Sequence, residues 1–210
     1  MIIKKIFTLF LIGRKLAKSG AVAHIAKFFK IPILVKILFY ILGFSFSKSH
    51  IQNSDEINLC KSLEDMGTTF IKLGQFLATR PDIIGEELAR DLEKLQDKLP
   101  PFNYYEAKEI IRSELGEENF KNISNIDESI AAASIAQVHF ATISNNGEKK
   151  DVAIKILRPN IEKIFNEELD ALMLLAFIIE SIIHKSKRLK LMEVVHLLRE
   201  ITNIEMDLRF

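Results

Sequence analysis

The 210-residue chain contains one cysteine, Cys60, and five histidines. A single cysteine cannot form an internal disulfide or assemble a cysteine-rich metal site, and it fits a reducing compartment. The histidines never occur at the i, i+4 spacing that would place two of them on one helical face as metal ligands. We therefore predict no metal site in this chain.

Glycine motifs that hold phosphate and long apolar runs are also missing. Among the eight glycines, neither GxGxxG nor GxxxxGK[ST] occurs. The first apolar run, 6–12, is closed by Arg14, and the second, 31–46, is interrupted by Lys36, so both fall short of the roughly 20 residues that cross a bilayer. No small-x-small cleavage site follows the first run at a suitable distance. The sequence thus predicts neither a transmembrane helix nor a cleaved signal peptide.

Acidic residues are absent from residues 1–50, which carry nine of the 29 Lys and Arg residues, whereas the remainder holds all 28 Asp and Glu residues. A basic segment that also contains apolar runs suits an anionic membrane surface. A basic helical hairpin docked on the body of the protein is the alternative interpretation. The charge pattern leaves both interpretations open.

Helical periodicity is the main pattern between residues 54 and 101. We predict two helices there, with stops before Pro81 and at Pro100, because the residue before a proline disfavours the α region. A third helix is delimited by Asn103, which is a favourable N-cap, and by Gly116 just past its last turn. Helical periodicity returns at 161–183 and again from residue 189 to the end of the chain.

Short runs rich in β-forming residues lie between these helical parts. Runs 135–143 and 152–157 flank the step Asn146-Gly147, and this arrangement predicts an antiparallel hairpin. A further strand at 130–133 would complete three strands, since a lone hairpin is only marginally stable in water.

The segment 63–79 sorts into stripes when it is wound at 3.6 residues per turn. Each helical glycine costs about 1 kcal/mol relative to alanine, so two glycines in one helix indicate the close approach of another surface. Ordinary helix packing with a solvated Lys72 is the alternative. The stripes are an apolar seam of Leu63, Met66, Phe70, Leu73 and Leu77, a polar stripe of Thr68, Lys72, Gln75 and Thr79, and a stripe of Gly67, Gly74 and Ala78 beside Ile71.

The tetrapeptide Val152-Ala153-Ile154-Lys155 matches the strand of protein kinases whose lysine contacts the phosphates of the nucleotide. A hairpin lies directly upstream, where kinases carry a glycine-rich loop, but here the loop is Ala131-Ala132-Ala133-Ser134. The Cβ of alanine opposes the positive φ and the close backbone approach that glycine permits. The alternatives are an ordinary exposed lysine on a strand and a tightly packed strand end.

Together these features resemble the UbiB family of atypical kinase-like proteins, which is associated with ubiquinone biosynthesis. The resemblance covers residues 57–210. It rests on the KxGQ motif at Lys72–Gln75, the Ala-rich loop that continues into Gln137-Val138-His139, Lys155 followed by Arg158-Pro159, and Glu205-x-Asp207. One departure is Ala136, where the family usually has glycine.

The resemblance implies that the KxGQ helix covers the face at which protein kinases admit a peptide, which would exclude protein substrates. It implies a KxGQ/ExD site formed by Lys72, Gln75, Glu205 and Asp207, in which Lys72 pairs with Glu205 or with Asp207. Residues two apart on a helix do not point the same way, so both carboxylates cannot face Lys72 alike. The alternative for Glu205 is a surface pair with Arg209.

The resemblance also implies ATP or ADP with Mg²⁺ as the cofactor. Lys155 would contact a nucleotide phosphate, and the Ala-rich loop would cover it with Ala131, Ala132, Ala133 and Ser134. The family's catalytic loop and Mg²⁺ ligands come at positions later than Phe210. We therefore predict no complete catalytic set and no metal ligand within this chain.

The predicted fold class is α+β and mainly helical, with a KxGQ helical extension and an incomplete protein-kinase-like small lobe that contains a small antiparallel sheet. The predicted domains are a basic apolar helical segment at 1–50, the KxGQ helical extension at 51–126 and the partial kinase-like lobe at 127–210.

The predicted function is that of the N-terminal portion of a UbiB-type atypical kinase or ATPase that binds ATP or ADP and supports ubiquinone biosynthesis at the membrane. The alternatives are a non-catalytic membrane-surface or partner-binding fragment, and a degraded coding sequence whose product never folds stably. The resemblance implies a peripheral location at the cytoplasmic face of the bacterial inner membrane, or its mitochondrial equivalent. Anionic lipid, ubiquinone-biosynthesis proteins and a chain that supplies the C-terminal lobe are the expected partners, and no nucleic acid is expected.

Overall fold

The computed structural model of the 210-residue chain describes residues 2–19, 59–97, 99–145, 147–182 and 188–209. Its internal contacts divide the chain into two compact units, residues 1–96 with 162–210 and residues 97–161. We call them the helical unit and the sheet unit. The domain boundaries predicted at residues 50 and 126 stay a prediction, and residues 20–50 of the predicted basic segment lie outside the described residues.

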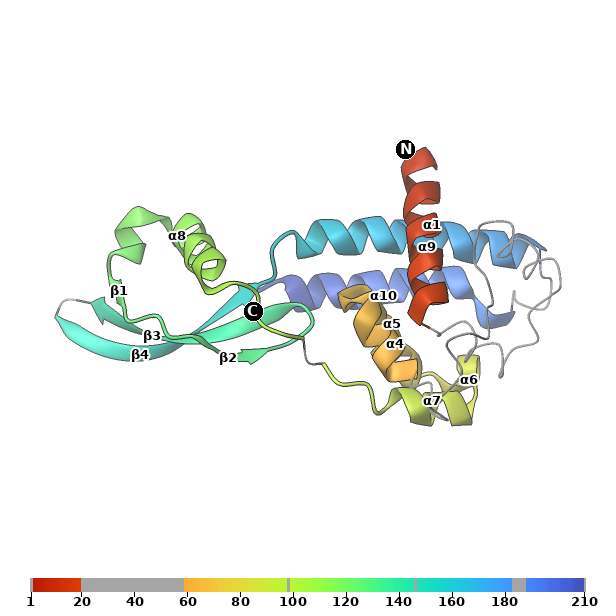
Figure 1. The fold of residues 1–210 in the computed structure, drawn as a ribbon, viewed down its shortest axis with the longest axis horizontal. Coiled ribbons are helices and arrows are strands. Elements are labelled where there is room, and N and C mark those ends of the chain that lie inside the picture. The colour runs from red at the N-terminus through yellow and green to blue at the C-terminus, as the bar shows by residue number, and fades with distance from the viewer. Residues whose placement is uncertain (1, 20–58, 98, 146, 183–187, 210) are drawn as a thin grey trace. The chain divides into compact units, whose positions relative to one another are not determined.

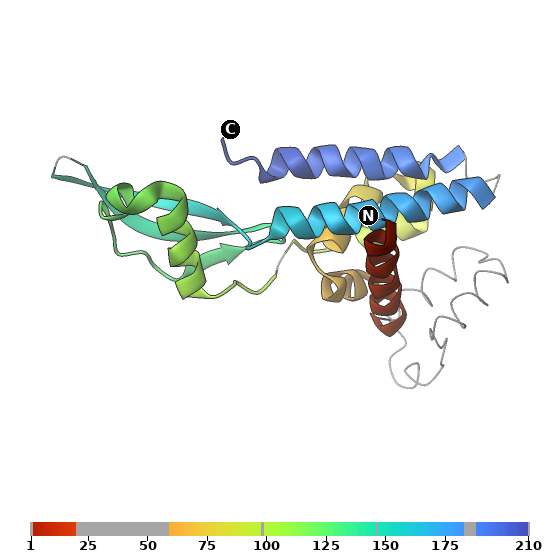
Figure 2. The ribbon, with the colours of Figure 1, turned by 90° about the horizontal axis from the view of Figure 1, so that it is seen from above.

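The helical unit is built around two long helices, α9 and α10, which lie side by side, with α1 crossing α9 (Figures 1 and 2). None of the helices in the described parts of the chain is long and apolar enough to cross a membrane. The helices of this unit are α1 (Ile2–Ser19), α4 (Leu59–Met66), α5 (Thr68–Ala78), α6 (Pro81–Ile84), α7 (Glu86–Leu92), α9 (Ile161–Ile182) and α10 (Leu191–Met206).

Helix α1 is fastened to the helical unit by both apolar and charged contacts. Ile12 is buried, with 2% of its surface exposed. Three lysines of α1 pair with acidic residues of α9, with nitrogen–oxygen distances of 2.7 Å for Lys4–Glu167, 3.1 Å for Lys5–Asp170 and 3.7 Å for Lys15–Glu168. Residues 2–19 therefore dock on the helical unit, and the choice between the two interpretations of the whole basic segment stays a prediction.

The predicted single helix through residues 63–79 is wrong, because Gly67 divides it into α4 and α5. Gly67 has φ +103° and ψ −172°, a conformation that lies outside the helical region and favours glycine. A second glycine, Gly85, has φ +88° and separates α6 from α7. The described residues of segment 54–101 thus form four short helices where two were predicted.

Gly74 is where the predicted close approach occurs. A Cβ placed on Gly74 would lie 2.6 Å from Leu95 Cδ2 and 2.8 Å from Leu63 Cδ1, both closer than real Cβ contacts allow. No atom lies within 4 Å of a Cβ placed on Gly67. The small-residue prediction is therefore confirmed at Gly74 and wrong at Gly67, whose role is to end α4.

The sheet unit contains a four-stranded antiparallel sheet in which β3 pairs with each of the other strands. The predicted hairpin and the third strand are confirmed, whereas β1 was not predicted. The strands are β1 (Ile123–Ser124), β2 (Ser129–Ala132), β3 (Ala136–Asn145) and β4 (Glu148–Leu157).

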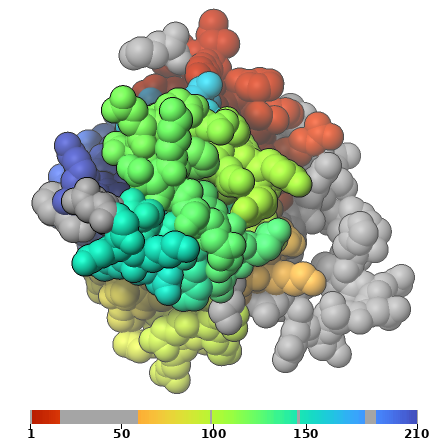
Figure 3. Space-filling model, turned by 90° about the vertical axis from the view of Figure 1, so that its left-hand side faces the viewer, coloured from red at the N-terminus to blue at the C-terminus, as the bar shows by residue number. Residues whose placement is uncertain are grey.

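Helix α8 (Tyr104–Phe120) covers one face of this sheet (Figures 1 and 3). The predicted cap is confirmed, because the Asn103 side chain accepts hydrogen bonds from the amides of Tyr105 at 2.8 Å and Glu106 at 3.3 Å. Gly116 has φ +77° and interrupts the helix as predicted, although one more turn follows. The core between α8 and the sheet is formed by Ala107, Ile111 and Ile156, with Phe102, Ile110, Phe120, Ile123, Ile126 and Ile154 around them.

Candidate functional site

The helical unit brings together Lys72 on α5 and Glu205 near the end of α10, which are the first residues of the KxGQ and ExD motifs. The Lys72 Nζ donates to Glu205 Oε1 at 2.5 Å. The Lys72 side chain is 11% exposed and the Glu205 side chain 37%. A charge pair with one largely buried member interacts more strongly than two exposed charges would, because less water screens it. Of the two partners predicted for Lys72, the structure therefore selects Glu205.

Asp207 lies apart from this pair because α10 ends at Met206. Asp207 has φ −81° and ψ 103°, so its backbone is extended and its side chain leaves the helical face of Glu205. Its carboxylate accepts hydrogen bonds from Arg209 Nε at 2.7 Å and from the Arg209 amide at 3.1 Å. These bonds lower the pKa of Asp207 to about 2. Arg209 thus pairs with Asp207, and the alternative surface pair of Arg209 with Glu205 is absent.

Gln75 is the remaining residue predicted for the KxGQ/ExD site. It lies on α5, three residues beyond Lys72, and is partly buried. The structure pairs Gln75 with neither carboxylate of the ExD motif. Its predicted role in the site stays a prediction.

In the sheet unit, Lys155 projects from the face of the sheet that α8 leaves uncovered. Ile154 and Ile156 belong to the core under α8, and side chains alternate along a strand, so Lys155 lies on the opposite face. Its cross-strand partner is Val138, and partners directly opposite share a face. Lys155 is exposed. The arrangement places an accessible ammonium group beside the apolar Val138.

The Ala-rich loop begins on the same face and turns back tightly. Ala131 pairs with Val138 and is exposed, whereas Ser134 is fully buried. The Ala133 amide donates to Ala136 O at 2.8 Å. Two groups from outside the loop, Arg158 and Asp97, fasten it further.

Arg158 and Asp97 hold the loop by its backbone. Arg158 donates from Nε and Nη2 to Ala133 O at 3.0 and 2.8 Å, and from Nη2 to Pro100 O at 3.0 Å. The Asp97 carboxylate accepts from the Ser134 amide at 2.7 Å. Burial lowers the pKa of Arg158, and the charge of Asp97 opposes this change. The amides of Ala133 and Ser134 are therefore engaged in hydrogen bonds within the protein.

Gln137 and His139 form a buried polar network on the other face of β3. Gln137 Oε1 accepts from the Phe102 amide at 2.9 Å, and its Nε2 lies 2.9 Å from His139 Nε2. Because the amide nitrogen of Gln137 can only donate, His139 Nε2 accepts and its Nδ1–H donates to Asp127 O at 2.8 Å. The QVH motif therefore has a structural role here, since it ties the backbone of Phe102 and the backbone of Asp127 to the sheet.

Sequence reasoning did not find the roles of Asp97, Arg158, Gln137 and His139. Gln137 and His139 alternate with apolar residues in a strand, and a polar pair on the buried face of a strand is a detectable pattern. Asp97 and Arg158 carry no such pattern, because their contact with the loop depends on chain segments far apart in sequence. Among the described residues, no group of three or more His, Cys, Asp or Glu is arranged to hold a metal ion.

Comparison with known proteins places this chain in a family. Residues 94–210 match the ABC1 atypical kinase-like domain. The chain is similar to proteins named "Probable protein kinase UbiB" from Marinobacter nauticus, with 36% identity over 184 residues, and from Shewanella loihica, with 35% identity over 175 residues. No solved structure matches the chain. The chain therefore belongs to the ABC1 and UbiB family of atypical kinase-like proteins, and the predicted family is confirmed.

The chain covers only part of its relatives. The matches span 86% and 81% of this chain but 32% of each of these two relatives. A Shewanella baltica relative is 40% identical over 137 residues, which are 64% of this chain and 24% of that protein. The chain thus spans between about a quarter and a third of the length of the curated relatives that it matches.

Proposed function

We propose that this chain is the N-terminal portion of a UbiB-type atypical kinase or ATPase that binds ATP or ADP through Lys155. The observation that carries the proposal is the position of Lys155 on the uncovered face of the sheet, directly opposite Val138. A nucleotide base can lie against small apolar side chains while an ammonium group meets its phosphates. Val138, Ala131 and Ala153 supply that apolar surface, because they lie on the same face by strand alternation.

The residues fit a nucleotide in part. Lys155 would meet the phosphates, whereas the amides of Ala133 and Ser134 would have to leave Ala136 and Asp97 before they could donate to a ligand. Bound ATP would supply a transferable phosphoryl group, and bound Mg²⁺ would neutralise part of its charge. In the family, the Mg²⁺ ligands are expected at sequence positions that follow the matched region.

The KxGQ/ExD pair supports a role other than peptide phosphorylation. Lys72 and Glu205 hold α5 against α10 by a partly buried ion pair. By the family resemblance, this pair closes the face at which a protein kinase admits its peptide. We propose that the whole protein acts in support of ubiquinone biosynthesis, on a lipid or on other biosynthetic proteins, from the cytoplasmic face of the bacterial inner membrane.

Nucleotide binding by the 210-residue chain tests the proposal. Fluorescent ADP and ATP analogues would be titrated with the wild type, with Lys155→Ala and with Lys149→Ala. Lys149 is a matched control, because it is exposed on the same strand and face, about 20 Å from Lys155. We expect Lys155→Ala to weaken binding about tenfold or more, since it removes a charged phosphate contact. Equal binding by the two variants, or no binding by the wild type, would contradict the proposal.

A second candidate function, contact with an anionic membrane surface, is favoured by the outer side of α1. Lys4 and Lys5 pair with acidic residues of α9, while Ile3 and Phe7 are 79% and 60% exposed. Flotation with anionic vesicles tests this candidate. We expect Phe7→Asp to reduce flotation and the control Leu115→Asp, at an exposed leucine of α8, to leave it unchanged. Equal flotation of the wild type and Phe7→Asp would refute membrane contact through α1.

A further inference from the structure

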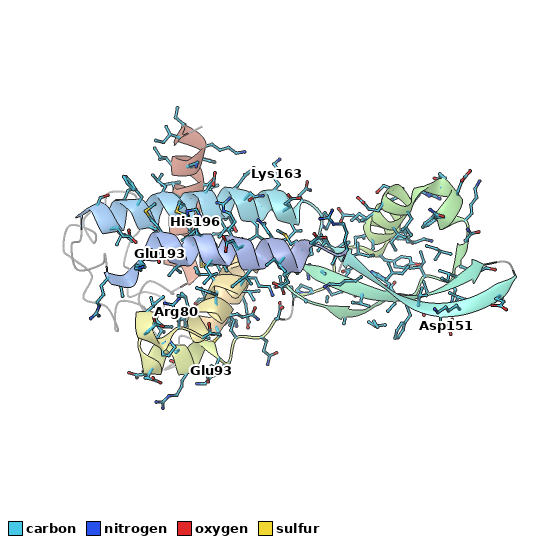
Figure 4. The ribbon with its side chains drawn as sticks, turned by 180° about the vertical axis from the view of Figure 1, so that it is seen from behind. Arg80, Glu93, Asp151, Lys163, Glu193 and His196 are labelled. Atoms are coloured by element: carbon cyan, nitrogen blue, oxygen red, sulfur yellow. The ribbon has the colours of Figure 1, made fainter. Side chains whose placement is uncertain are left out.

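A cavity with a volume of about 390 Å³ lies in the helical unit, between α6 and the start of α10. Arg80 and Ile83 line it on one side, and Arg188, Glu193 and Leu197 on the other. Figure 4 labels Arg80 and Glu193 on these two sides. The cavity is distinct from the Lys72–Glu205 pair, because Leu197 precedes Glu205 by about 12 Å along α10.

The charged part of the cavity wall is cationic. Arg80, Arg188 and Lys190 face two carboxylates, those of Asp82 and Glu193, so the charged groups leave one positive charge in excess. Arg80 binds Asp82 with nitrogen–oxygen distances of 2.8 and 2.7 Å, and Lys190 lies 3.0 Å from Glu193. Arg188 forms no ion pair with a carboxylate of the described residues. Its guanidinium group therefore supplies the excess charge.

The two ion pairs in the charged part of the cavity wall do not prevent an anion from binding there. Both are exposed, with side-chain exposures of 35% and 61% for Arg80–Asp82 and 66% and 68% for Lys190–Glu193. Exposed pairs of this kind contribute little net free energy, so an anion with two or three acceptor oxygens can compete with them.

The rest of the cavity wall is apolar. Ile83, Leu189, Val194 and Leu197 line it, and Leu197 remains 40% exposed. A bare inorganic anion would leave this wall in contact with water. A ligand that carries an alkyl or prenyl chain would cover the wall and gain free energy from the apolar surface that it buries.

We propose that this cavity binds an anionic amphiphile, with a phosphate head group at Arg80, Arg188 and Lys190 and an apolar chain against Ile83, Val194 and Leu197. The head group can belong to a membrane lipid or to a soluble phosphorylated amphiphile, since the two share this chemistry. The site is independent of nucleotide binding at Lys155 and of membrane contact through α1.

Calorimetric titration of the 210-residue chain with decyl phosphate tests the proposal. Decyl maltoside, which lacks the anionic head group, and inorganic phosphate, which lacks the alkyl chain, are the comparison ligands. We expect decyl phosphate to bind more tightly than either. Arg188→Gln should weaken this binding about tenfold through loss of a charge-assisted contact, and Leu197→Ser about fourfold through loss of apolar contact. The control is Lys163→Gln, at an exposed lysine near the N-terminus of α9 (Figure 4). This variant should leave binding unchanged.

Unchanged thermal midpoints would establish that the variants fold. Equal binding of decyl phosphate and decyl maltoside, or equal effects of Arg188→Gln and Lys163→Gln, would overturn the proposal. Sedimentation with phosphatidylcholine vesicles, with and without phosphatidic acid, separates the two sources of the head group. Binding to phosphatidic acid vesicles that is lost in Arg188→Gln assigns a membrane lipid, and binding of decyl phosphate alone assigns a soluble amphiphile.

Discussion

Lys72 and Glu205 are 133 residues apart in the chain and meet where α5 packs against α10. Neither helix alone would fix the lysine side chain, because a long flexible side chain loses conformational entropy when it is held in one geometry. The Lys72 side chain is only 11% exposed. Loss of the Glu205 carboxylate should therefore lower the free energy of unfolding more than the loss of a carboxylate that pairs with an exposed lysine would.

At the same scale, we expect Glu205→Gln to lower the free energy of unfolding by about 1–2 kcal/mol, because Lys72 would lose a charged partner while largely buried. Lys72→Met combined with Glu205→Gln should lose less than the sum of the two single variants. Urea denaturation measures each change. The exposed pair Lys94–Asp91 is the control, whose coupling should be below about 1 kcal/mol. Strict additivity of the Lys72 and Glu205 variants would show that the pair contributes nothing.

Asp207 provides a prediction about pH. Its pKa is lowered from 3.8 to about 2, first by the side-chain hydrogen bonds from Arg209. A carboxyl group whose pKa is lower in the folded state adds stability above its unfolded pKa, and this stability is lost as the pH falls from about 4 toward about 2. We expect the pKa of Asp207, followed by NMR of its carboxyl carbon, to return toward 3.8 in Arg209→Gln. A pKa that stays near 2 in this variant would rule out Arg209 as the cause.

At the scale of elements, the junction of α5 with α4 and α7 depends on Gly74. The Cβ of Gly74→Ala would press on Leu95 and Leu63. Overpacking typically costs 1–3 kcal/mol, while alanine gains about 1 kcal/mol in helix propensity, so we expect a net loss of about 1 kcal/mol in unfolding free energy. Urea denaturation measures this loss.

The matched test of that junction changes Leu95. In a Leu95→Val background the contact at 2.6 Å is relieved, so Gly74→Ala should cost less there or become favourable. An equal cost in both backgrounds would mean that the Leu95 side chain does not set the limit on residue 74.

At the scale of the whole molecule, the chain corresponds to 32% of the relatives from M. nauticus and S. loihica. Phosphoryl transfer needs groups that position Mg²⁺ and the nucleophile as well as a lysine for the phosphates. From the family resemblance, we expect those groups at positions that follow the matched residues 94–210. The helical and sheet units would thus carry nucleotide contact and the KxGQ/ExD pair without the catalytic loop.

We therefore expect the purified 210-residue chain to bind ATP without hydrolysing it in the presence of Mg²⁺. Release of phosphate measures turnover, and Lys155→Ala separates an activity of this chain from that of a contaminant. Hydrolysis by the wild type that is abolished in Lys155→Ala would show that this portion of the protein is catalytic by itself.

The sequence by itself determined the features that depend on neighbouring residues. Asn103 caps α8 because an N-cap needs only the first turn of its own helix, and Gly147, with φ +88°, allows the hairpin because only local backbone geometry is involved. Strand alternation then places Lys155 opposite the face under α8. The break at Gly67 was missed because helical periodicity continues in register across one glycine.

Only the tertiary structure decided which distant groups meet. Lys72 pairs with Glu205 and not with Asp207 because α10 ends at Met206 and turns the second carboxylate away. Arg158 and Asp97 hold the Ala-rich loop, and Arg80 and Arg188 share a cavity, through the packing of segments far apart in sequence. No periodicity encodes such contacts, because they depend on where each element ends and against which surface it is buried.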